Sequence, residues 1–217
     1  LKDGKIKKTL NKVEVNENIL IQTMVGENVS SAKIDNNFDR SINILALKNL
    51  SFLNYFQDIN FDLYKGEILG LSGLLGSGSN EILRCIFGIF KYDKGSIHLN
   101  NSNIKINKPK DAINNGIGYI PSDRKHEGLI QTSSIKNNSV LTIYNLLTQI
   151  GFFNSNEASR QTRNYVNKLS IKVSDIDNFV MNLSGGNQQK VVIAKWLAKK
   201  CKILLFDEPT KGIDVAA

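Results

Sequence analysis

The segment that most constrains the fold runs from residue 67 to residue 90, where a glycine-rich turn separates two apolar runs. EILGLS comes first, GLLGSGSNE follows, and ILRCIFGIF completes the segment. A buried strand, a glycine turn and a helix in this order present free backbone amides to a phosphate group. The sequence therefore predicts an α/β fold built around a phosphate-binding loop.

This glycine loop, residues 73–78, meets only part of the pattern G-x-x-x-x-G-K-[ST]. Ser79 stands in place of the lysine, and Asn80 replaces the hydroxyl that binds magnesium. Glu81 adds a negative charge to the first turn of the helix, where a phosphate would lie. The candidate nucleotide-binding residues are Gly73, Leu74, Leu75, Gly76, Ser77, Gly78, Ser79, Asn80 and Glu81.

A second apolar run, residues 203–206, ends in two carboxylates, Asp207 and Glu208. Ligands of open α/β sheets bind at the carboxyl ends of the strands. One carboxylate there can hold Mg²⁺ through water, and its neighbour can orient or deprotonate an attacking water. Since a strand ending in Asp-Glu-Pro is also common as a solvated turn, these residues alone leave both readings open.

The segment NLSGGNQQKVVIAKWLAKK begins with a serine and two glycines and continues as an amphipathic helix. Ser184, Gly185 and Gly186 would lie at the helix N-terminus, where free N–H groups and the helix dipole attract an anion. Serine caps are common on helices that bind nothing, so position alone favours a purely structural cap. The predicted buried face contains Val191, Ala194, Leu197 and Ala198.

The net charge of +8 and the isoelectric point near 9.4 are compatible with a nucleic-acid or anionic-membrane partner. A general abundance of lysine, asparagine and isoleucine is the stronger explanation, because no block of five or six like charges occurs. Cys85 and Cys201 show no metal-ligand spacing, and we predict two buried, reduced thiols. The apolar runs are too short to cross a membrane, so membrane association requires another chain.

Short alternating runs predict strands at 44–50 and 59–64, a hairpin at 96–106 and a buried strand at 117–121. A further buried strand is predicted at 66–73, and helices at 80–89 and 109–116. Residues 133–180 have a helical pattern that places Ala158, Tyr165 and Leu169 on one face. The polar residues 1–41, with a short helical pattern at 19–24, predict a linker.

Taken in order, GLLGSGSNE, LSGGNQQK and ILLFDEPTKGID resemble the P-loop, signature motif, Walker B strand and D-loop of an ABC-type ATPase cassette. The paired glutamines of LSGGNQQK make this resemblance specific. It implies an α/β P-loop NTPase fold with an antiparallel β subdomain and a helical subdomain.

The resemblance narrows to sugar importers of the ribose, galactose and xylose type, whose ATPase subunit carries two cassettes in one chain. GEILGLSGLLGSGSNE and YIPSDRKHEGLI are similar to segments of their second cassette, and LKDGKIKKT is similar to the end of the first. It implies that residues 1–41 are the tail of a preceding cassette and a linker. Residues 42–217 would be a second nucleotide-binding domain truncated at its C-terminus, with the helical subdomain at about 133–182.

The resemblance also assigns roles to residues. Glu208 would be catalytic, Asp207 would hold Mg²⁺ through water, Asn80 would bind the metal weakly, and Asp214 would lie in the D-loop. The signature residues would cover ATP held by the other cassette. They are Leu183, Ser184, Gly185, Gly186, Asn187 and Gln188.

Several positions depart from the family pattern. Ser79 stands where second cassettes usually have arginine, and Ser122 occupies the Q-loop position. The family's histidine follows the D-loop and would fall beyond Ala217, and neither His98 nor His126 can replace it because both precede the Walker B strand. The aromatic residue that stacks on adenine stays open, with Phe52 and Tyr55 in the right region.

The resulting hypothesis is the ATP-hydrolysing subunit of a carbohydrate importer, with ATP and Mg²⁺ as ligands and a degenerate P-loop in this cassette. Its implied partners are membrane permease subunits, the first cassette of the same chain and, indirectly, a periplasmic or lipoprotein sugar-binding protein, but no nucleic acid. The implied location is the cytoplasmic side of the cell membrane, as a peripheral protein. Residues 1–217 alone are expected to be inactive.

Two alternatives remain at this stage. A soluble ABC ATPase acting on ribosomes or nucleic acid would suit the positive charge, although the sequence has no long heptad pattern for a coiled-coil arm. A catalytically silent regulatory module would suit the missing lysine. A bond from a charged donor contributes about 1.5–3 kcal/mol, so that loss should weaken ATP binding by roughly 10- to 150-fold.

Overall fold

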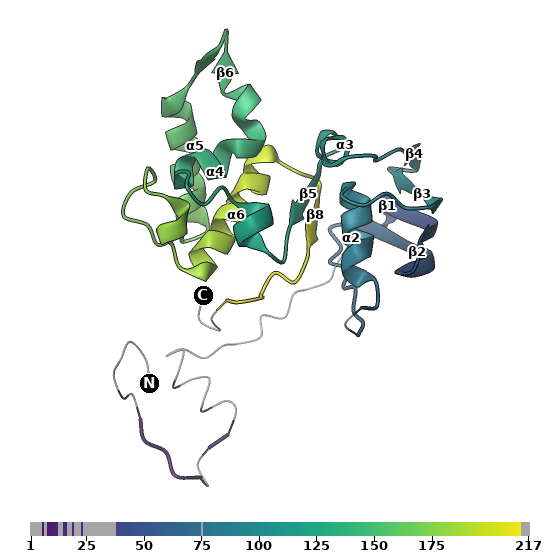
Figure 1. Cartoon of the computed structure of the whole chain (residues 1–217), viewed down its shortest axis with the longest axis horizontal. Coiled ribbons are helices and arrows are strands. Elements are labelled where there is room, and N and C mark those ends of the chain that lie inside the picture. The colour runs from purple at the N-terminus through teal and green to yellow at the C-terminus, as the bar shows by residue number, and fades with distance from the viewer. Residues whose placement is uncertain are drawn as a thin grey trace. The chain divides into compact units, whose positions relative to one another are not determined.

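The computed structural model of the chain describes residues 6, 8–12, 15, 16, 19, 23, 38–74 and 76–213 (Figure 1). Asn37–Ile213 forms one compact unit, and Leu1–Asn36 with Asp214–Ala217 forms another. Most of the predicted linker, including the helical pattern at 19–24, lies outside the described residues. The first strand begins at Asp39, within the segment predicted as linker.

A four-stranded antiparallel sheet of order β2-β1-β3-β4 forms one side of the larger unit. Its strands are β1 (Asp39–Phe52), β2 (Phe56–Lys65), β3 (Lys94–Leu99) and β4 (Ser102–Ile104). They confirm the strands and the hairpin predicted from alternation. Asn100 and Asn101 join β3 to β4 with φ values of 47° and 65°, a left-handed conformation that asparagine tolerates in tight hairpin turns.

Helix α2 (Ser79–Phe87) lies between this sheet and a pair of parallel strands (Figure 1). Its apolar face buries Ile82, Cys85, Ile86 and Phe87 in the main core. Gly88 ends the helix at φ 79°, and its amide donates to the carbonyls of the last turn. The helix predicted at 80–89 is thus present, with its first residue directly after the glycine loop.

The parallel strands are β5 (Ile117–Ile120) and β8 (Ile203–Phe206), paired with Ile120 opposite Phe206. Helix α3 (Pro109–Asn114) precedes β5, and α6 (Gly185–Lys199) precedes β8. All four elements were predicted. β8 is less buried than expected, because Phe206 is 43% exposed. The buried face of α6 contains the predicted Val191 and Ala194 and also Val192, Lys195 and Trp196.

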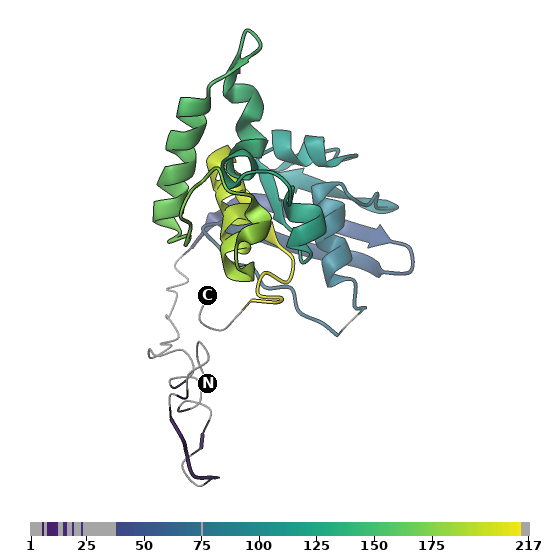
Figure 2. The same ribbon diagram turned by 60° about the vertical axis from the view of Figure 1, so that its left-hand side comes forward.

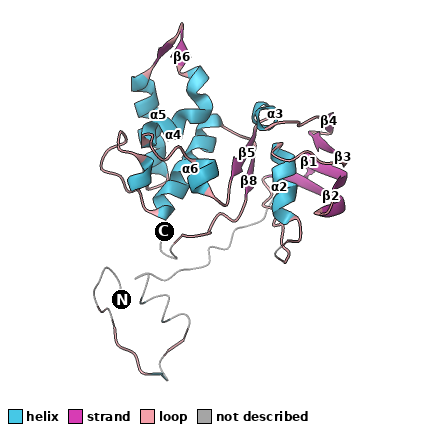
Figure 3. Ribbon diagram, viewed as in Figure 1, coloured by secondary structure: helices cyan, strands magenta, loops and turns pink. Residues whose placement is uncertain are grey.

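The strand predicted at residues 66–73 is absent. Residues 67–73 have no regular secondary structure, and Figure 3 shows a loop between β2 and α2. Ile68 is 68% exposed and Leu74 is 88% exposed. An apolar parallel strand is stable when neighbouring strands and helices cover both of its faces. Among the described residues the parallel sheet has only β5 and β8, which supply no such cover.

The helical subdomain projects from the sheets in both views (Figures 1 and 2). It contains α4 (Ile135–Val140), η3 (Leu141–Leu146), α5 (Ser155–Lys168) and η4 (Val180–Asn182). The short hairpin β6 (Thr148–Gln149) and β7 (Phe152–Phe153) was not predicted. A small core of its own contains Val140, Ile143, Leu147 and Ala158.

The α5 face predicted from the pattern is largely confirmed. Ala158 is fully buried, and Leu169, directly after the helix, packs against the main core. The Tyr165 hydroxyl donates a hydrogen bond to the Leu197 carbonyl at 3.0 Å, which ties α5 to α6.

The cysteines and the membrane expectation can also be compared with the structure. Both thiols are free, but only Cys85 is fully buried, and Cys201 is half-buried. Within the described part of the chain, no helix is both long and apolar enough to cross a bilayer.

Candidate functional site

The glycine loop enters α2 through glycines in the left-handed region. Gly76 has φ 81° and Gly78, the N-cap of α2, has φ 89°. A Cβ atom on Gly78 would lie 2.6 Å from the Tyr55 carbonyl oxygen, so both conformation and space require glycine. No side chain caps α2, and its first-turn amides are therefore available to an anion. Leu75 lies outside the described residues.

Two predicted site residues from distant segments meet beside this loop. Glu208 forms an ion pair with the Lys211 ammonium, whose Nζ lies 2.9 Å from Oε2, and the Asn80 side chain lies near it. Lys211 first, and then Asn80, lower the pKa of Glu208. The backbone of Glu208 is left-handed at φ 44°, a conformation that strains a residue other than glycine.

Asp207 is the buried member of the carboxylate pair, at 2% exposure. Its Oδ2 accepts a 2.6 Å hydrogen bond from the Tyr119 hydroxyl and lies 3.9 Å from Nε of Arg84. Its Oδ1 is buried with no hydrogen-bond partner. Burial first, and then the bond to Asp207, raises the pKa of Tyr119, so the hydroxyl stays a donor.

Arg84 connects α2 to two acidic groups. Besides its approach to Asp207, its Nη2 donates to both carboxylate oxygens of Glu127, at 2.9 and 3.1 Å. The guanidinium thus supplies the positive charge on α2 that compensates these carboxylates. The Arg84 guanidinium is thus paired with Glu127 and lies near Asp207 at the end of β8, and not at the glycine loop.

The predicted signature residues divide into two groups. Ser184 is exposed and Gly185 is half-buried, so both can meet a ligand at the start of α6. The Ser184 hydroxyl accepts from the Asn187 amide at 2.9 Å and caps no backbone amide. The other members serve the fold: Leu183 packs on the core, Gly186 is buried, Asn187 accepts from the Lys172 amide, and Gln188 donates to the Val180 carbonyl.

The Q-loop position lies near the residues after Glu208, which we name the D-loop turn (residues 209–213). Ser122 lines a shallow cavity of about 260 Å³ with Asp123, Arg124, Lys125, Lys211 and Gly212. Arg124 donates to two carbonyls of the turn. Asp214, the predicted D-loop aspartate, lies outside the described residues.

The two aromatic candidates for adenine stacking lie beside the glycine loop. The rings of Phe52 and Tyr55 are parallel within 11°, with centroids 4.8 Å apart, and Tyr55 is 49% exposed. Because the Tyr55 carbonyl also faces Gly78, an exposed aromatic face is close to the phosphate loop. The adenine role stays a prediction.

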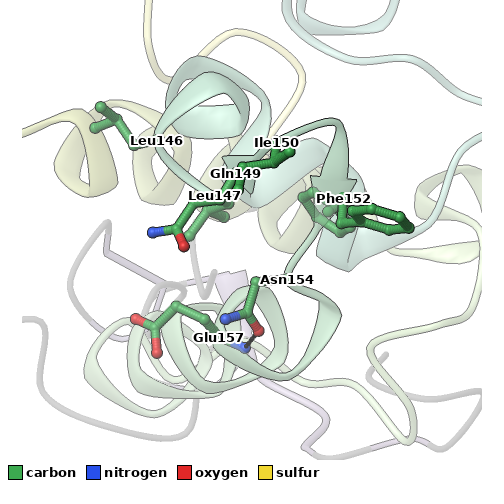
Figure 4. A pocket seen from close by; sticks show the side chains of 8 residues that line it. Leu146, Leu147, Gln149, Ile150, Phe152, Asn154 and Glu157 are labelled. Atoms are coloured by element: carbon green, nitrogen blue, oxygen red, sulfur yellow. Dashed lines mark hydrogen bonds between the residues drawn. The ribbon is translucent and has the colours of Figure 1, made fainter.

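A larger cavity of about 450 Å³ lies elsewhere, at the tip of the helical subdomain (Figure 4). Its walls are mainly apolar and come from η3, the β6–β7 hairpin and the start of α5. The lining residues are Leu146, Leu147, Gln149, Ile150, Phe152, Phe153, Asn154 and Glu157. None of them belongs to the predicted nucleotide site.

The residues at the end of β8 suit a hard cation held mostly by phosphate and water. No cluster of three or more His, Cys, Asp or Glu side chains able to hold a metal occurs in the described residues. The described residues directly after β8 offer one orphaned acceptor, the buried Oδ1 of Asp207. Mg²⁺ commonly uses one or two carboxylates together with substrate phosphates and several waters, and this donor set fits such an ion.

Four contributors to the site were not singled out from the sequence: Tyr119, Arg84, Lys211 and Arg124. Tyr119 is the one with a sequence signal, since it lies in a predicted buried strand, and its hydroxyl needs a partner there. Arg84 and Arg124 have partners far along the chain, which pattern alone does not locate, whereas Lys211 pairs with Glu208 three residues before it.

The site joins a glycine loop before a helix to two carboxylates after a parallel strand, and this combination defines a P-loop nucleotide-binding protein. The family model described as ABC transporter matches residues 56–211. The chain belongs to the ABC transporter family.

The similar curated proteins are sugar-import subunits. Over its whole length the chain is 41% identical to the ribose import ATP-binding protein RbsA of Clostridium tetani and covers 43% of that protein. It is 40% identical to the xylose import ATP-binding protein XylG of Thermoanaerobacter pseudethanolicus and covers 45% of it. The chain thus spans somewhat less than half the length of these relatives.

Solved cassettes share the fold. A dimeric ATP-binding cassette in a post-hydrolysis state, bound to ADP and Pi, superposes with a TM-score of 0.66 at 23% identity, over 79% of this chain and 77% of that one. The cassette cbiO1 from Clostridium perfringens gives 0.61 at 24% identity, over 80% of this chain and 68% of that one. The predicted α/β cassette fold is therefore confirmed.

Proposed function

We propose that this chain is part of the ATP-binding subunit of a sugar importer, that it forms one of two cassettes, and that its own glycine loop binds ATP weakly. The approach of the Asn80 side chain to Glu208, beside the buried Asp207, is the observation that carries the proposal. It joins the start of α2 to the end of β8, where phosphate and attacking water would meet. The sugar-import names of the similar proteins support the transport role.

In this proposal each residue has a defined task. The amides of the glycine loop and the first turn of α2 hold the phosphates. Mg²⁺, held through Asp207 and more weakly Asn80, would neutralise phosphate charge. Tyr119 and Arg84 fix Asp207 through Oδ2, which leaves Oδ1 free. Glu208 accepts the proton of an attacking water once its bond from Lys211 loosens.

The signature segment would act on a different nucleotide, held by the first cassette in a head-to-tail pair. The exposed Ser184 and the adjacent Gly185 are its only members available to such a ligand. The same segment therefore serves the site with the expected intact lysine, whereas Glu208 serves the degenerate one. The alternative of a nucleic-acid partner receives no support from the relatives, whose names refer to sugar import.

An uptake assay tests this division of tasks. We expect Gly185→Asp in the full-length transporter to abolish most ATP-driven sugar uptake into membrane vesicles, since its side chain would enter the space of the Arg124 guanidinium and the D-loop turn and would put a negative charge at the N-terminus of α6. Glu208→Gln should leave most uptake. Ser170→Asp, which adds the same charge on an exposed turn, is the matched control at equal protein level. A severe loss in Glu208→Gln alone would place the working site in this cassette instead.

For the membrane permease we propose the β6–β7 hairpin as a contact surface. Ile150 is 98% exposed and Phe152 is 81% exposed. No charged residue lies between 137 and 156, so the exposed surface of this hairpin is largely apolar and uncharged. Ile150 also has φ 50°, which is rare for a β-branched residue. A subunit on the cytoplasmic side of the membrane would use such a surface to meet an apolar pocket of its partner.

The test replaces Ile150 and Phe152 by Asp and measures co-purification with the permease. We expect its loss with ATP binding unchanged, because the hairpin is remote from the glycine loop and aspartate tolerates φ 50° better than isoleucine. Leu53→Asp, at a 67% exposed position on the β1–β2 turn, is the control. Intact co-purification of the hairpin variant would contradict the assignment.

A further inference from the structure

Arg124 reaches from the first residue of η2 (Arg124–Gly128) to the D-loop turn. Its Nη1 donates to the Lys211 carbonyl at 2.8 Å, and its Nη2 donates to the Gly212 carbonyl at 3.0 Å. A planar guanidinium that bonds two successive carbonyls fixes their orientation as well as their position. The turn lies outside helix and strand, so its place depends on such contacts.

The same guanidinium lies against the first residue of α6. A Cβ atom on Gly185 would be 2.5 Å from Nη2 of Arg124 and 3.0 Å from the Gly212 carbonyl oxygen. Gly185 is not among the residues with positive φ, so its conformation does not demand glycine. Space does, because the Arg124 side chain and the D-loop turn occupy the volume that a larger residue would need.

The backbone of η2 is itself fixed on α6. Asp123 caps the first amides of η2, those of Lys125 and His126, at 3.1 and 3.2 Å. At its other end the buried Nζ of Lys195, on α6, donates to the Gly128 carbonyl at 2.6 Å. The Lys195 bond thus ties the end of η2 to α6. Arg124, at the start of η2, is bonded to the D-loop turn.

We infer that Arg124 is a positioning residue that couples the start of the signature segment to the D-loop turn, and that Gly185 is small to make room for it. The inference rests on the proposed function for its consequence. The signature segment meets the nucleotide of one cassette, whereas the D-loop turn follows Glu208 of the other site. A shift of α6 on nucleotide contact is passed by Arg124 to the turn that carries the Lys211 partner of Glu208.

Hydrogen exchange of this chain without nucleotide tests the coupling apart from transport. The reporters are the Lys211 and Ile213 amides, which bond to the Glu208 and Thr210 carbonyls. Arg124→Met keeps the aliphatic stem but removes both donors, and we expect these amides to exchange about tenfold faster or more. Arg124→Lys, which retains the charge and one bond, should give a smaller increase. Lys125→Met, at an exposed neighbour, should give none.

A double variant separates coupling from general support of the fold. Gly185→Ala should also speed exchange, because its Cβ displaces the guanidinium. Added to Arg124→Met, it should have a much smaller effect, limited to the direct approach of its Cβ to the Gly212 carbonyl. Additive effects, or unchanged exchange in Arg124→Met, would overturn the inference. If Arg124→Met also loses protection in β8 and α6, the fold itself is affected, and Arg124→Lys becomes the deciding variant. Exchange of the Lys211 and Ile213 amides in Arg124→Lys equal to that of the parent chain would overturn the inference.

Turnover completes the test in the full-length transporter. Arg124→Met should lower kcat for ATP while leaving its KM nearly unchanged, because the guanidinium also lies against Gly185, the signature residue assigned to the intact site. Arg124→Lys should restore part of the rate. Faster exchange with unchanged kcat would overturn the positioning role although the contact exists. Absence of ATP-driven uptake in the parent would contradict the proposed function, and the exchange results would still stand.

Discussion

Helices α2 and α6 both begin with glycine-rich segments, but the charges around their two N-termini have opposite signs. Both present free amides at an N-terminus without a side-chain cap. α2 carries Glu81 in its first turn, whereas α6 has no acid there and lies against the Arg124 guanidinium. An anion is therefore opposed at α2 and favoured at α6. The glycine pattern alone does not identify the better site.

Their surroundings differ as well. The segment before α2 is an exposed loop, while the segment before α6 packs Leu183 on the core and is held by Asn187 and Gln188. The start of α6 is thus held by packing and hydrogen bonds, whereas the start of α2 follows an exposed loop. The predictions below either make the two N-termini alike or enlarge their difference.

The largest effect should come from restoring the missing charge at α2. Ser79→Lys with Asn80→Ser should strengthen ATP binding to this chain by about 10- to 150-fold, because a charged donor bond contributes about 1.5–3 kcal/mol. Isothermal calorimetry measures the gain. Ser77→Lys places the same charge one residue before Gly78 and should give much less. No gain in the double variant would mean that the exposed loop, and not the side chain, is what limits binding.

A smaller effect concerns the charges inside each helix. Arg84 of α2 is paired with carboxylates, whereas the Lys195 ammonium of α6 has a backbone carbonyl and the Trp196 ring as neighbours. Burial lowers the pKa of Lys195 to about 8 from 10.5. Between these values the unfolded chain binds more protons, so stability should rise with pH. From pH 7 to 9 this gain amounts to about 1 kcal/mol.

Denaturant unfolding of the parent chain and Lys195→Met at several pH values isolates this contribution. The comparison with Lys195→Met is needed because burial raises the pKa of Cys85 to about 12 from 9.0. The buried thiol therefore makes the folded chain less stable as pH rises above 9. The parent should gain stability relative to Lys195→Met as pH rises from 7 to 9. Parallel curves would show that the amine is not desolvated.

The smallest effect should follow from Glu81→Gln, which removes the opposing charge from α2. ATP binding should improve by about two- to fivefold, since a charge at a helix N-terminus is worth about 0.3–1 kcal/mol. The gain should shrink in high salt because Glu81 is partly exposed. Glu157→Gln, in the first turn of α5, is the matched control. Weaker binding in Glu81→Gln would reverse the proposed electrostatic difference.

Sequence patterns located the elements whose formation is local. The alternation of β1 and β2, the Asn-Asn turn of the β3–β4 hairpin and the periodicity of α6 each predicted the observed element. Residues 66–73 are an exception. They have the composition of a buried parallel strand, but composition does not tell whether neighbouring strands and helices pack on both faces of the segment. The β6–β7 hairpin was missed because its turn contains Ile150 where Asn or Gly is usual.

The candidate site was predictable as a set of segments but not as a set of contacts. Gly78, Asn80 and Glu208 followed from motifs, and the structure brings the last two together. The bond from Tyr119 to Asp207 joins residues 88 apart in sequence, and it depends on the register of β5 against β8. Arg124 joins three segments at once. Such contacts follow from tertiary packing, which no single pattern encodes.

The left-handed backbone of Glu208 has a consequence for laboratory evolution. Glycine, or to a lesser extent asparagine, would adopt φ 44° with less strain, so variants at this position should accumulate when a library is selected for thermal stability alone. A strained glutamate at the mouth of a degenerate site is retained only while turnover is also selected. The frequency of Glu208 after selection for turnover as well as stability would therefore report whether this glutamate still does chemistry.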